Sequence, residues 1–143
     1  MSFQYEKMIV ETDLDMFGHV NHARYLSILE EARWAIVREV GFGMERVMKD
    51  RLGPVILGVN IQYKSELRNQ DHICIITESI GEIGKVMQLS QRIVKKDGDV
   101  ASEAIITYGL MDLNQRKLIY PSEEWIEKMA MGLQHTQKQE PTS

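Results

Sequence analysis

The feature that most restricts how this chain can fold is a run from 22 to 40 with too few polar residues for a surface helix. Apolar residues recur there at spacings of three and four, which places them on one helical face. Further apolar residues occupy the other sides, and a helix of that kind must be enclosed by other elements. The run therefore predicts a central, buried helix. Its main face consists of Tyr25, Ile28, Leu29, Ala32, Ile36 and Val40.

Both ends of this predicted helix carry recognisable signals. Asn21 is a candidate N-cap, because a short side-chain acceptor there can bond a free N–H in the first turn. Gly41 and Gly43 follow the last apolar residue, and glycine adopts the left-handed conformation that ends helices at low cost. The segment 12–21 before the helix holds two acids, a histidine and a glycine. A polar, acid-bearing loop thus leads into the N-terminus of a buried helix, which is a position suited to chemistry.

After residue 54 the apolar pattern changes to a period of two, which is typical of strands with one buried face. In the first such run the expected buried face is Val55, Leu57, Val59, Ile61 and Tyr63. The expected strands are 3–12, 55–64, 72–80, 86–95 and 100–112, with 118–120 as a short extension. Turns are expected at 69–71, 81–84 and 96–99. Because these turns are too short for crossovers, the last four long strands are expected to be linked by hairpins in an antiparallel sheet.

Two more helical segments are expected. A short helical turn at Met44–Met48 lies between glycines, and a C-terminal helix runs from a Ser122 cap to about Leu133, with acids in its first turn. The polar tail 134–143 is expected to fray. The length of the chain fits a single domain over 1–133. The pattern as a whole is α+β, with an antiparallel sheet wrapped around one long helix.

Composition excludes several classes of protein. A formal net charge of −4 argues against a general nucleic-acid binder, which needs a basic surface. The single cysteine, Cys74, excludes an intrachain disulfide, and no cysteine or histidine spacing suggests a metal site. There is no signal-peptide layout and no run of 18 apolar residues. We therefore expect a soluble cytoplasmic protein with no membrane partner and no metal.

The segment 12–26 reads Thr-Asp-Leu-Asp-Met-Phe-Gly-His-Val-Asn-His-Ala-Arg-Tyr-Leu. It is very similar to the Asp-x-Asp-x-x-Gly-x-Val-x-x-x-x-Tyr signature of the 4-hydroxybenzoyl-CoA thioesterase-like family. The resemblance extends from the first strand to about Tyr120, and Pro54 opening the second strand also fits it. It implies a hotdog fold and an acyl-CoA thioesterase that assembles as a homodimer or homotetramer. The stretch Gly18 to Asn21 also resembles acyl-acyl carrier protein thioesterases of the same fold.

The resemblance implies that Asp15, the second acid of the pair, is the catalytic carboxylate. Thioester hydrolysis needs either an attacking carboxylate, which gives an acyl-enzyme anhydride, or a base that activates water, and the sequence leaves both open. Free N–H groups at the helix N-terminus, with the His22 amide among them, are the expected oxyanion donors. Asn21, as the cap, would hold these amides in place. Gly18 would let the backbone approach the thioester closely.

The remaining candidates have less specific signals. Asp13 is interpreted as structural, whereas His19 has three open roles: a second acid/base, a donor to the substrate, or a packed polar residue. Tyr25 is expected in the core and at the acyl pocket. Coenzyme A carries phosphates, and Lys64 and Arg68 are the preferred cations for them.

Four functions remain in competition at this stage. The first is an acyl-CoA thioesterase that needs no cofactor beyond the coenzyme A of its substrate. The second is a thioesterase for acyl carrier protein, and the third is a hotdog hydratase with Asp15 and His19 as an acid/base pair. The fourth is a non-catalytic acyl-CoA-binding module, since a fold does not by itself determine a function. The retained Asp15 argues against this last class.

Overall fold

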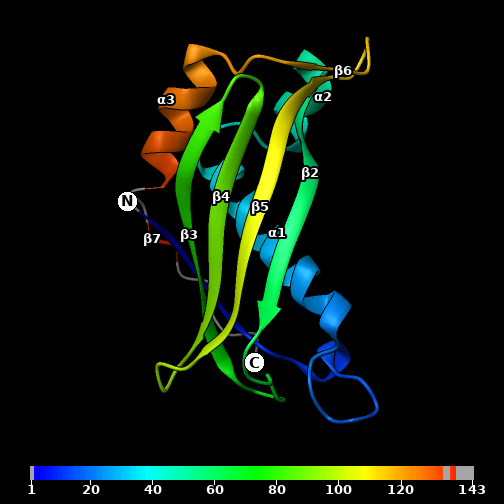
Figure 1. Cartoon of the computed structure of the whole chain (residues 1–143), viewed down its shortest axis with the longest axis vertical. Helices are drawn as coiled ribbons and strands as arrows, with labels where there is room; N and C mark the ends of the chain where they lie inside the picture. The colour runs from blue at the N-terminus through cyan, green and yellow to red at the C-terminus, as the bar shows by residue number, and fades with distance from the viewer. Residues whose placement is uncertain (1, 134–135, 138–143) are drawn as a thin grey trace.

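A computed structural model describes residues 2–133 and 136–137 of the chain. One curved sheet lies along the long helix α1, which runs diagonally behind it in Figure 1. The helical elements are η1 (Glu11–Asp13), α1 (His22–Glu39), α2 (Met44–Asp50) and α3 (Glu123–Gly132). The strands are β1 (Phe3–Met8), β2 (Leu52–Tyr63), β3 (His72–Ile83), β4 (Val86–Lys95), β5 (Val100–Asp112), β6 (Lys117–Ile119) and β7 (Thr136–Gln137).

Within the described residues, seven strands form one sheet in the order β2-β5-β4-β3-β1-β7, with β6 paired to β5. All neighbouring strands are antiparallel except β1 and β7, which are parallel. The predicted α+β hotdog architecture, with an antiparallel sheet wrapped around one long helix, is therefore confirmed.

The central helix forms as its sequence signals predict. The Asn21 side chain accepts a hydrogen bond from the Ala23 N–H at 2.9 Å. The helix ends at Glu39, and Gly41 follows with a φ of +91° that favours glycine. The residues of the main face that are completely buried are Ile28, Leu29, Ala32 and Ile36. The helix N-terminus is thus fixed in space by the packing of the whole helix.

Both flanking helices were also anticipated. The predicted turn at Met44–Met48 is the start of α2, which continues to Asp50. At α3, the Ser122 hydroxyl accepts from the Trp125 N–H at 3.1 Å, as the cap prediction requires. Trp125 is buried and its ring lies 5.0 Å from that of Phe42, so α3 closes one end of the core.

The prediction that β2 and β3 form a hairpin is wrong. β2 pairs with β5, and β3 lies on the far side of β4. The connection 64–71 instead passes the N-terminal end of α1, where Leu67 is fully buried and its carbonyl accepts from the Val20 N–H at 2.8 Å. A turn signal at 69–71 marks a change of direction, but it carries no information about the strand that will be the partner.

The predicted alternation in β2 is also wrong in detail. A bulge between Ile56 and Gly58 shifts the register, so Ile56, opposite Tyr108, lies beside α1 in place of Leu57. The face toward the helix is not fully covered either, since Ile56, Val59 and Tyr63 are 41–46% exposed. β2 has one neighbouring strand among the described residues, and it therefore forms an open, apolar sheet edge.

Some strand ends differ from the expected ones. The first strand stops at Met8, because the backbone turns into η1. The turn expected at 81–84 comes later: β3 continues through a bulge at Gly81, with φ +142°, and reverses at Gly84, with φ +62°. The hairpin turn expected at 96–99 is confirmed.

The predicted frayed tail, 134–143, lies outside the described residues except for 136–137, whose backbone forms β7 beside β1. Among the described residues, no helix combines the length and the apolar character that crossing a membrane would require.

Candidate active site

The loop before α1 is closed on itself by backbone hydrogen bonds. Leu14 and Val20 form an isolated antiparallel bridge, and the Asp15 N–H donates to the His19 carbonyl at 3.0 Å. The Gly18 N–H donates back to the Asp15 carbonyl at 3.0 Å. Gly18 has a φ of +80°, and a Cβ there would meet nothing within 4 Å. In this chain the glycine is therefore needed for the backbone conformation of the turn.

This turn presents the Asp15 carboxylate in a defined orientation. Oδ1 accepts a hydrogen bond from the Phe17 N–H at 2.9 Å, as in an Asx turn. The residue is half-buried, and its Oδ2 makes no hydrogen bond with any described residue. One carboxylate oxygen is thus anchored, while the other remains available to a substrate or a water molecule.

The first turn of α1 follows this loop directly. The Asn21 cap occupies the Ala23 N–H, and the Arg24 N–H donates to the Asn21 carbonyl at 2.9 Å. The His22 N–H has no acceptor within the described part of the chain. An unoccupied amide at a helix N-terminus is a donor that can stabilise an oxyanion.

Two tyrosines connect the helix N-terminus to β2 and to the connection that follows it. The Tyr63 hydroxyl donates to the His22 carbonyl at 2.8 Å, and the Tyr25 hydroxyl donates to the Ser65 carbonyl at 3.2 Å. Their rings are perpendicular, with centroids 5.0 Å apart. Burial raises the pKa of Tyr25, so it remains a neutral donor. Tyr25 is a core residue, as expected, whereas the contact of Tyr63 with α1 was not foreseen.

These elements enclose a groove of about 600 Å³. It is lined by Asp15, Phe17, His19, Val20, Asn21, His22, Tyr25, Tyr63, Lys64, Ser65 and Glu66. The structure therefore brings six of the eight predicted site residues together, and Gly18 shapes the loop beside them. Arg68 does not line the groove. Sequence reasoning missed Phe17, Val20, Tyr63, Ser65 and Glu66 as lining residues. The first two lie in the motif without a chemical signal of their own, and the position of the other three depends on how β2 and the connection after it fold.

The two cations proposed for the phosphates have protein partners. The Lys64 ammonium lies 3.2 Å from a Glu103 carboxylate oxygen, with both side chains about half exposed. Arg68 forms an ion pair with Glu66, two residues earlier, and its side chain is 70% exposed. Such exposed pairs contribute little to stability, so either cation can exchange its partner for a phosphate at small cost.

His19 lies at the rim of the groove. Its Nδ1 is 3.2 Å from the Val20 carbonyl oxygen, and its ring stacks on Phe17 with centroids 6.0 Å apart. A hydrogen bond between Nδ1–H and that carbonyl would leave Nε2 as the nitrogen that can accept a proton.

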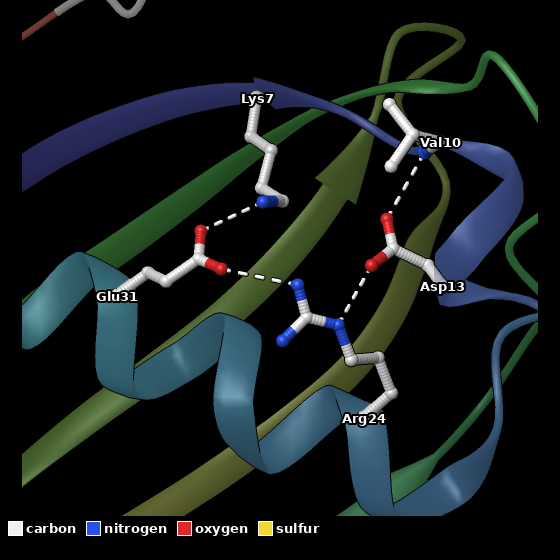
Figure 2. Close-up of polar contacts among 5 residues, drawn as sticks. All are labelled: Lys7, Val10, Asp13, Arg24 and Glu31. Carbon is white, nitrogen blue, oxygen red and sulfur yellow. Dashed lines mark hydrogen bonds and ion pairs between the residues drawn. The ribbon is translucent and has the colours of Figure 1, made fainter.

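Asp13 has a separate, structural environment, which Figure 2 shows. Its Oδ1 accepts from Arg24 Nε at 2.7 Å, and its Oδ2 accepts from the Val10 N–H at 3.0 Å. Arg24 also reaches Glu31 at 3.2 Å, and Lys7 donates to the same Glu31 at 2.7 Å. With both oxygens engaged and the side chain buried, Asp13 ties the loop to α1 and does not line the groove.

Comparison with known proteins identifies the family of this chain. The family model described as the thioesterase-like superfamily matches residues 10–131. The chain belongs to the thioesterase-like superfamily. The long-chain acyl-CoA thioesterase FadM of Escherichia coli (strain K12) is 33% identical over 117 residues, which cover 81% of this chain and 88% of FadM. The acyl-CoA thioester hydrolase YbgC of Escherichia coli O6:H1 is 27% identical over 110 residues, covering 77% and 82% of the two chains.

A solved structure shows the same fold. The crystal structure of YbaW, a probable thioesterase from Escherichia coli, superposes with a TM-score of 0.79 at 30% identity and covers 91% of this chain and 98% of its own. The predicted membership of a thioesterase family of hotdog fold is therefore confirmed, and so is the prediction of a thioester hydrolase as the class of enzyme.

The hydrogen bond between Asp13 and Arg24 is expected to stabilise this thioesterase-like domain. Burial alone would raise the pKa of Asp13, but the hydrogen bonds from Val10 and Arg24 outweigh it and lower that pKa. We expect Asp13→Asn to reduce the free energy of unfolding by about 1–3 kcal/mol at pH 7, because a charged acceptor is lost.

The pH dependence of this difference follows from the direction of the shift. A lowered folded-state pKa stabilises the fold above the unfolded-state value of about 4, and this contribution is lost as the pH falls through the folded-state pKa. Urea titrations of wild type and Asp13→Asn at pH 7 and pH 3 measure the difference in their free energies of unfolding at each pH. A stability difference that grows on acidification would contradict this account.

Proposed function

We propose that this protein hydrolyses the thioester of an acyl-CoA with Asp15 as the catalytic carboxylate. The observation that carries the proposal is the placement of two complementary groups on one groove. The free Oδ2 of Asp15 supplies a nucleophile or base, and the free His22 amide supplies an oxyanion donor. Hydrolysis of a thioester uses a nucleophile or base at the carbonyl carbon and a hydrogen-bond donor at the carbonyl oxygen.

The chemistry can follow either of two routes. In the first, Asp15 attacks the carbonyl carbon, the C–S bond breaks, coenzyme A leaves as the thiolate, and water then hydrolyses the anhydride. In the second, Asp15 removes a proton from water, whose oxygen attacks the same carbon, and the C–S bond then breaks with coenzyme A leaving as the thiolate. In both routes negative charge develops on the carbonyl oxygen, and a fixed amide stabilises it without reorganisation.

The choice of acyl-CoA rests on the relatives. FadM is named a long-chain acyl-CoA thioesterase and YbgC an acyl-CoA thioester hydrolase. Lys64, at the edge of the groove, is the cation we propose for a coenzyme A phosphate, and Arg68 would reach one only by leaving Glu66. A panel of acyl-CoA and acyl carrier protein thioesters of graded chain length tests the carrier and the acyl group together.

We also propose that the working protein is a homodimer at least. The edge of β2 is open, and Ile56, Leu57, Val59 and Tyr63 are exposed along it. Open apolar edges promote association, and a second copy would extend the sheet across a two-fold axis. Tyr63 and Lys64 at the end of β2 place the groove next to that seam. Light scattering at micromolar concentration should give at least twice the mass of the chain, and a stable, active monomer would refute this.

Asp15→Asn is the main test of the catalytic role. The substitution preserves size and the hydrogen bond from Phe17 but removes the negative charge, hence both nucleophile and base. We expect hydrolysis to fall by at least ~10²-fold, the usual cost of losing a positioned proton acceptor. Release of free thiol from the acyl-CoA panel measures the rate, while binding should largely survive.

Asp13→Asn is the matched control, since it removes an acid two positions away whose oxygens face Arg24 and Val10. It should retain far more activity, provided that circular dichroism shows both variants folded. Equal rates in wild type and Asp15→Asn would remove Asp15 from the mechanism. An inactive wild type across the whole panel would favour a non-catalytic acyl-CoA-binding module.

His19→Gln tests whether the rim histidine moves protons. Its contacts with Val20 and Phe17 are those of a residue that orients the loop, and glutamine preserves the polarity. We expect most of the hydrolysis rate to remain. A loss of ~10²–10⁴-fold, measured in the same thiol-release assay, would instead identify His19 as an acid/base catalyst.

A further inference from the structure

A second pocket lies away from the groove, where the C-terminal half of α1 meets the start of β2 and α3. Its free volume is about 130 Å³, and most of its walls are apolar. It is lined by Glu30, Arg33, Trp34, Ile36, Val37, Pro54, Ile56, Leu89, Tyr108, Trp125 and Met129. No step of the proposed hydrolysis uses these residues.

Arg33 places a cation in this apolar pocket. Its Nη1 donates to Gln91 Oε1 at 2.9 Å, and no carboxylate among the described residues lies within ion-pair distance of its guanidinium. Gln91 is completely buried and is itself fixed, because its Nε2 donates to the Leu29 carbonyl at 3.1 Å and to Thr77 Oγ1 at 3.0 Å. The guanidinium is therefore held in one position with donors to spare.

Burial lowers the pKa of Arg33, and the nearby charge of Glu30 opposes that effect. Arginine remains charged in proteins despite such a shift, so the pocket retains a positive group. Glu30 is exposed at the entrance, and it compensates the cation only at a distance.

Trp125, on α3, supplies a second donor. It is buried, and its indole Nε1–H makes no well-aligned hydrogen bond with a described residue, although the Tyr108 hydroxyl lies near enough to interact with it. A buried N–H without an acceptor costs free energy, which a ligand oxygen would recover. Burial raises the pKa of Tyr108 to about 12 against the lowering effect of the Trp125 N–H, so the Tyr108 hydroxyl stays protonated, and a ligand oxygen would compete with it for that N–H.

We propose that this pocket binds the carboxylate of an aliphatic acid, with Arg33 and Trp125 as donors to its oxygens. A guanidinium without an ion-pair partner selects an anion, and a carboxylate matches its planar fork. Apolar side chains of the pocket favour a ligand whose carboxylate is attached to a hydrocarbon chain. These side chains include Trp34, Val37, Leu89 and Met129. A strongly hydrated anion such as phosphate would leave these walls unmatched.

Such a carboxylate has two sources, which kinetics can distinguish. One is a free fatty acid, the product expected from the proposed hydrolysis. The other is the far end of an ω-carboxyacyl thioester. Arg33 follows His22 by 11 residues, which is about 17 Å along the helix. An extended alkyl chain advances about 1.3 Å per bond, so roughly 13 carbons span that distance.

The binding test uses the chain's own fluorescence. Its two tryptophans, Trp34 and Trp125, both line the pocket, so intrinsic emission reports its occupancy. Dodecanoate is titrated against the full chain, with dodecanol as the uncharged match. We expect dodecanoate to bind at least ~10-fold more tightly, as a hydrogen-bonded charge pair implies. Equal affinity for the two ligands, or no change in emission with dodecanoate, would overturn the proposal.

Variants assign the effect to the donors. Arg33→Met should weaken dodecanoate binding ~10-fold or more and leave dodecanol unaffected. Arg38→Met, on the same helix but exposed, is the matched control and should change neither affinity. If Arg33→Met does not fold, Arg33→Lys retains the charge without the fork. Trp125→Phe removes the N–H while keeping an aromatic ring, although a smaller one, and Trp34 still reports. Unchanged dodecanoate affinity in these folded variants would refute the assignment.

Kinetic measurements distinguish the two sources of the carboxylate. They rest on the proposed thioesterase activity, whereas the fluorescence titration measures binding without it. If the substrate supplies the carboxylate, dodecanedioyl-CoA should exceed dodecanoyl-CoA in kcat/KM by ~10-fold, and Arg33→Met should abolish that preference. If the free acid supplies it, dodecanoate should alter hexanoyl-CoA hydrolysis in wild type but not in Arg33→Met. An inactive enzyme that still binds dodecanoate through Arg33 would refute only the proposed function.

Discussion

Burial of α1 against the curved sheet is the interaction on which the rest of this structure depends. Each fully buried side chain such as Ile28, Leu29 or Ile36 contributes about 1.5–3 kcal/mol, and together they fix the position of the helix. The free amide at its first turn is then held rigidly, although it lies at the surface. A donor that is fixed by the core requires no reorganisation when negative charge develops near it, which is the condition for oxyanion stabilisation.

The loop depends on the helix in turn. Asp13 joins it to Arg24 through a buried, charge-assisted hydrogen bond, and Asp15, two residues later, is left to face the groove. Two acids of one motif thus have opposite roles because their surroundings differ. The tyrosine pair completes the arrangement, since Tyr63 connects the end of β2 to the first turn of α1. A change at the β2 edge, including association with a second copy, would therefore reach the groove directly.

The features that the sequence predicts correctly are those that depend on residues close together in the chain. The Asn21 and Ser122 caps, the end of α1 before Gly41 and the turn at 96–99 all depend on neighbouring residues, and all are confirmed. The pairing of β2 with β5, the bulge after Ile56 and the contact of Tyr63 with His22 depend on residues far apart in the chain. Periodicity cannot supply these. Arg68, by contrast, forms a local ion pair with Glu66, two residues earlier, and lies outside the groove.

The central claim is that the thioester lies between Asp15 and the first turn of α1. A crystal structure of Asp15→Asn with a bound long-chain acyl-CoA tests this most directly, because the distances from the substrate carbonyl to the side chain of residue 15 and to the His22 amide can be measured. We expect a carbonyl carbon within about 3.5 Å of that side chain and a carbonyl oxygen at hydrogen-bond distance from the amide. An acyl-CoA whose thioester lies outside the groove would contradict it.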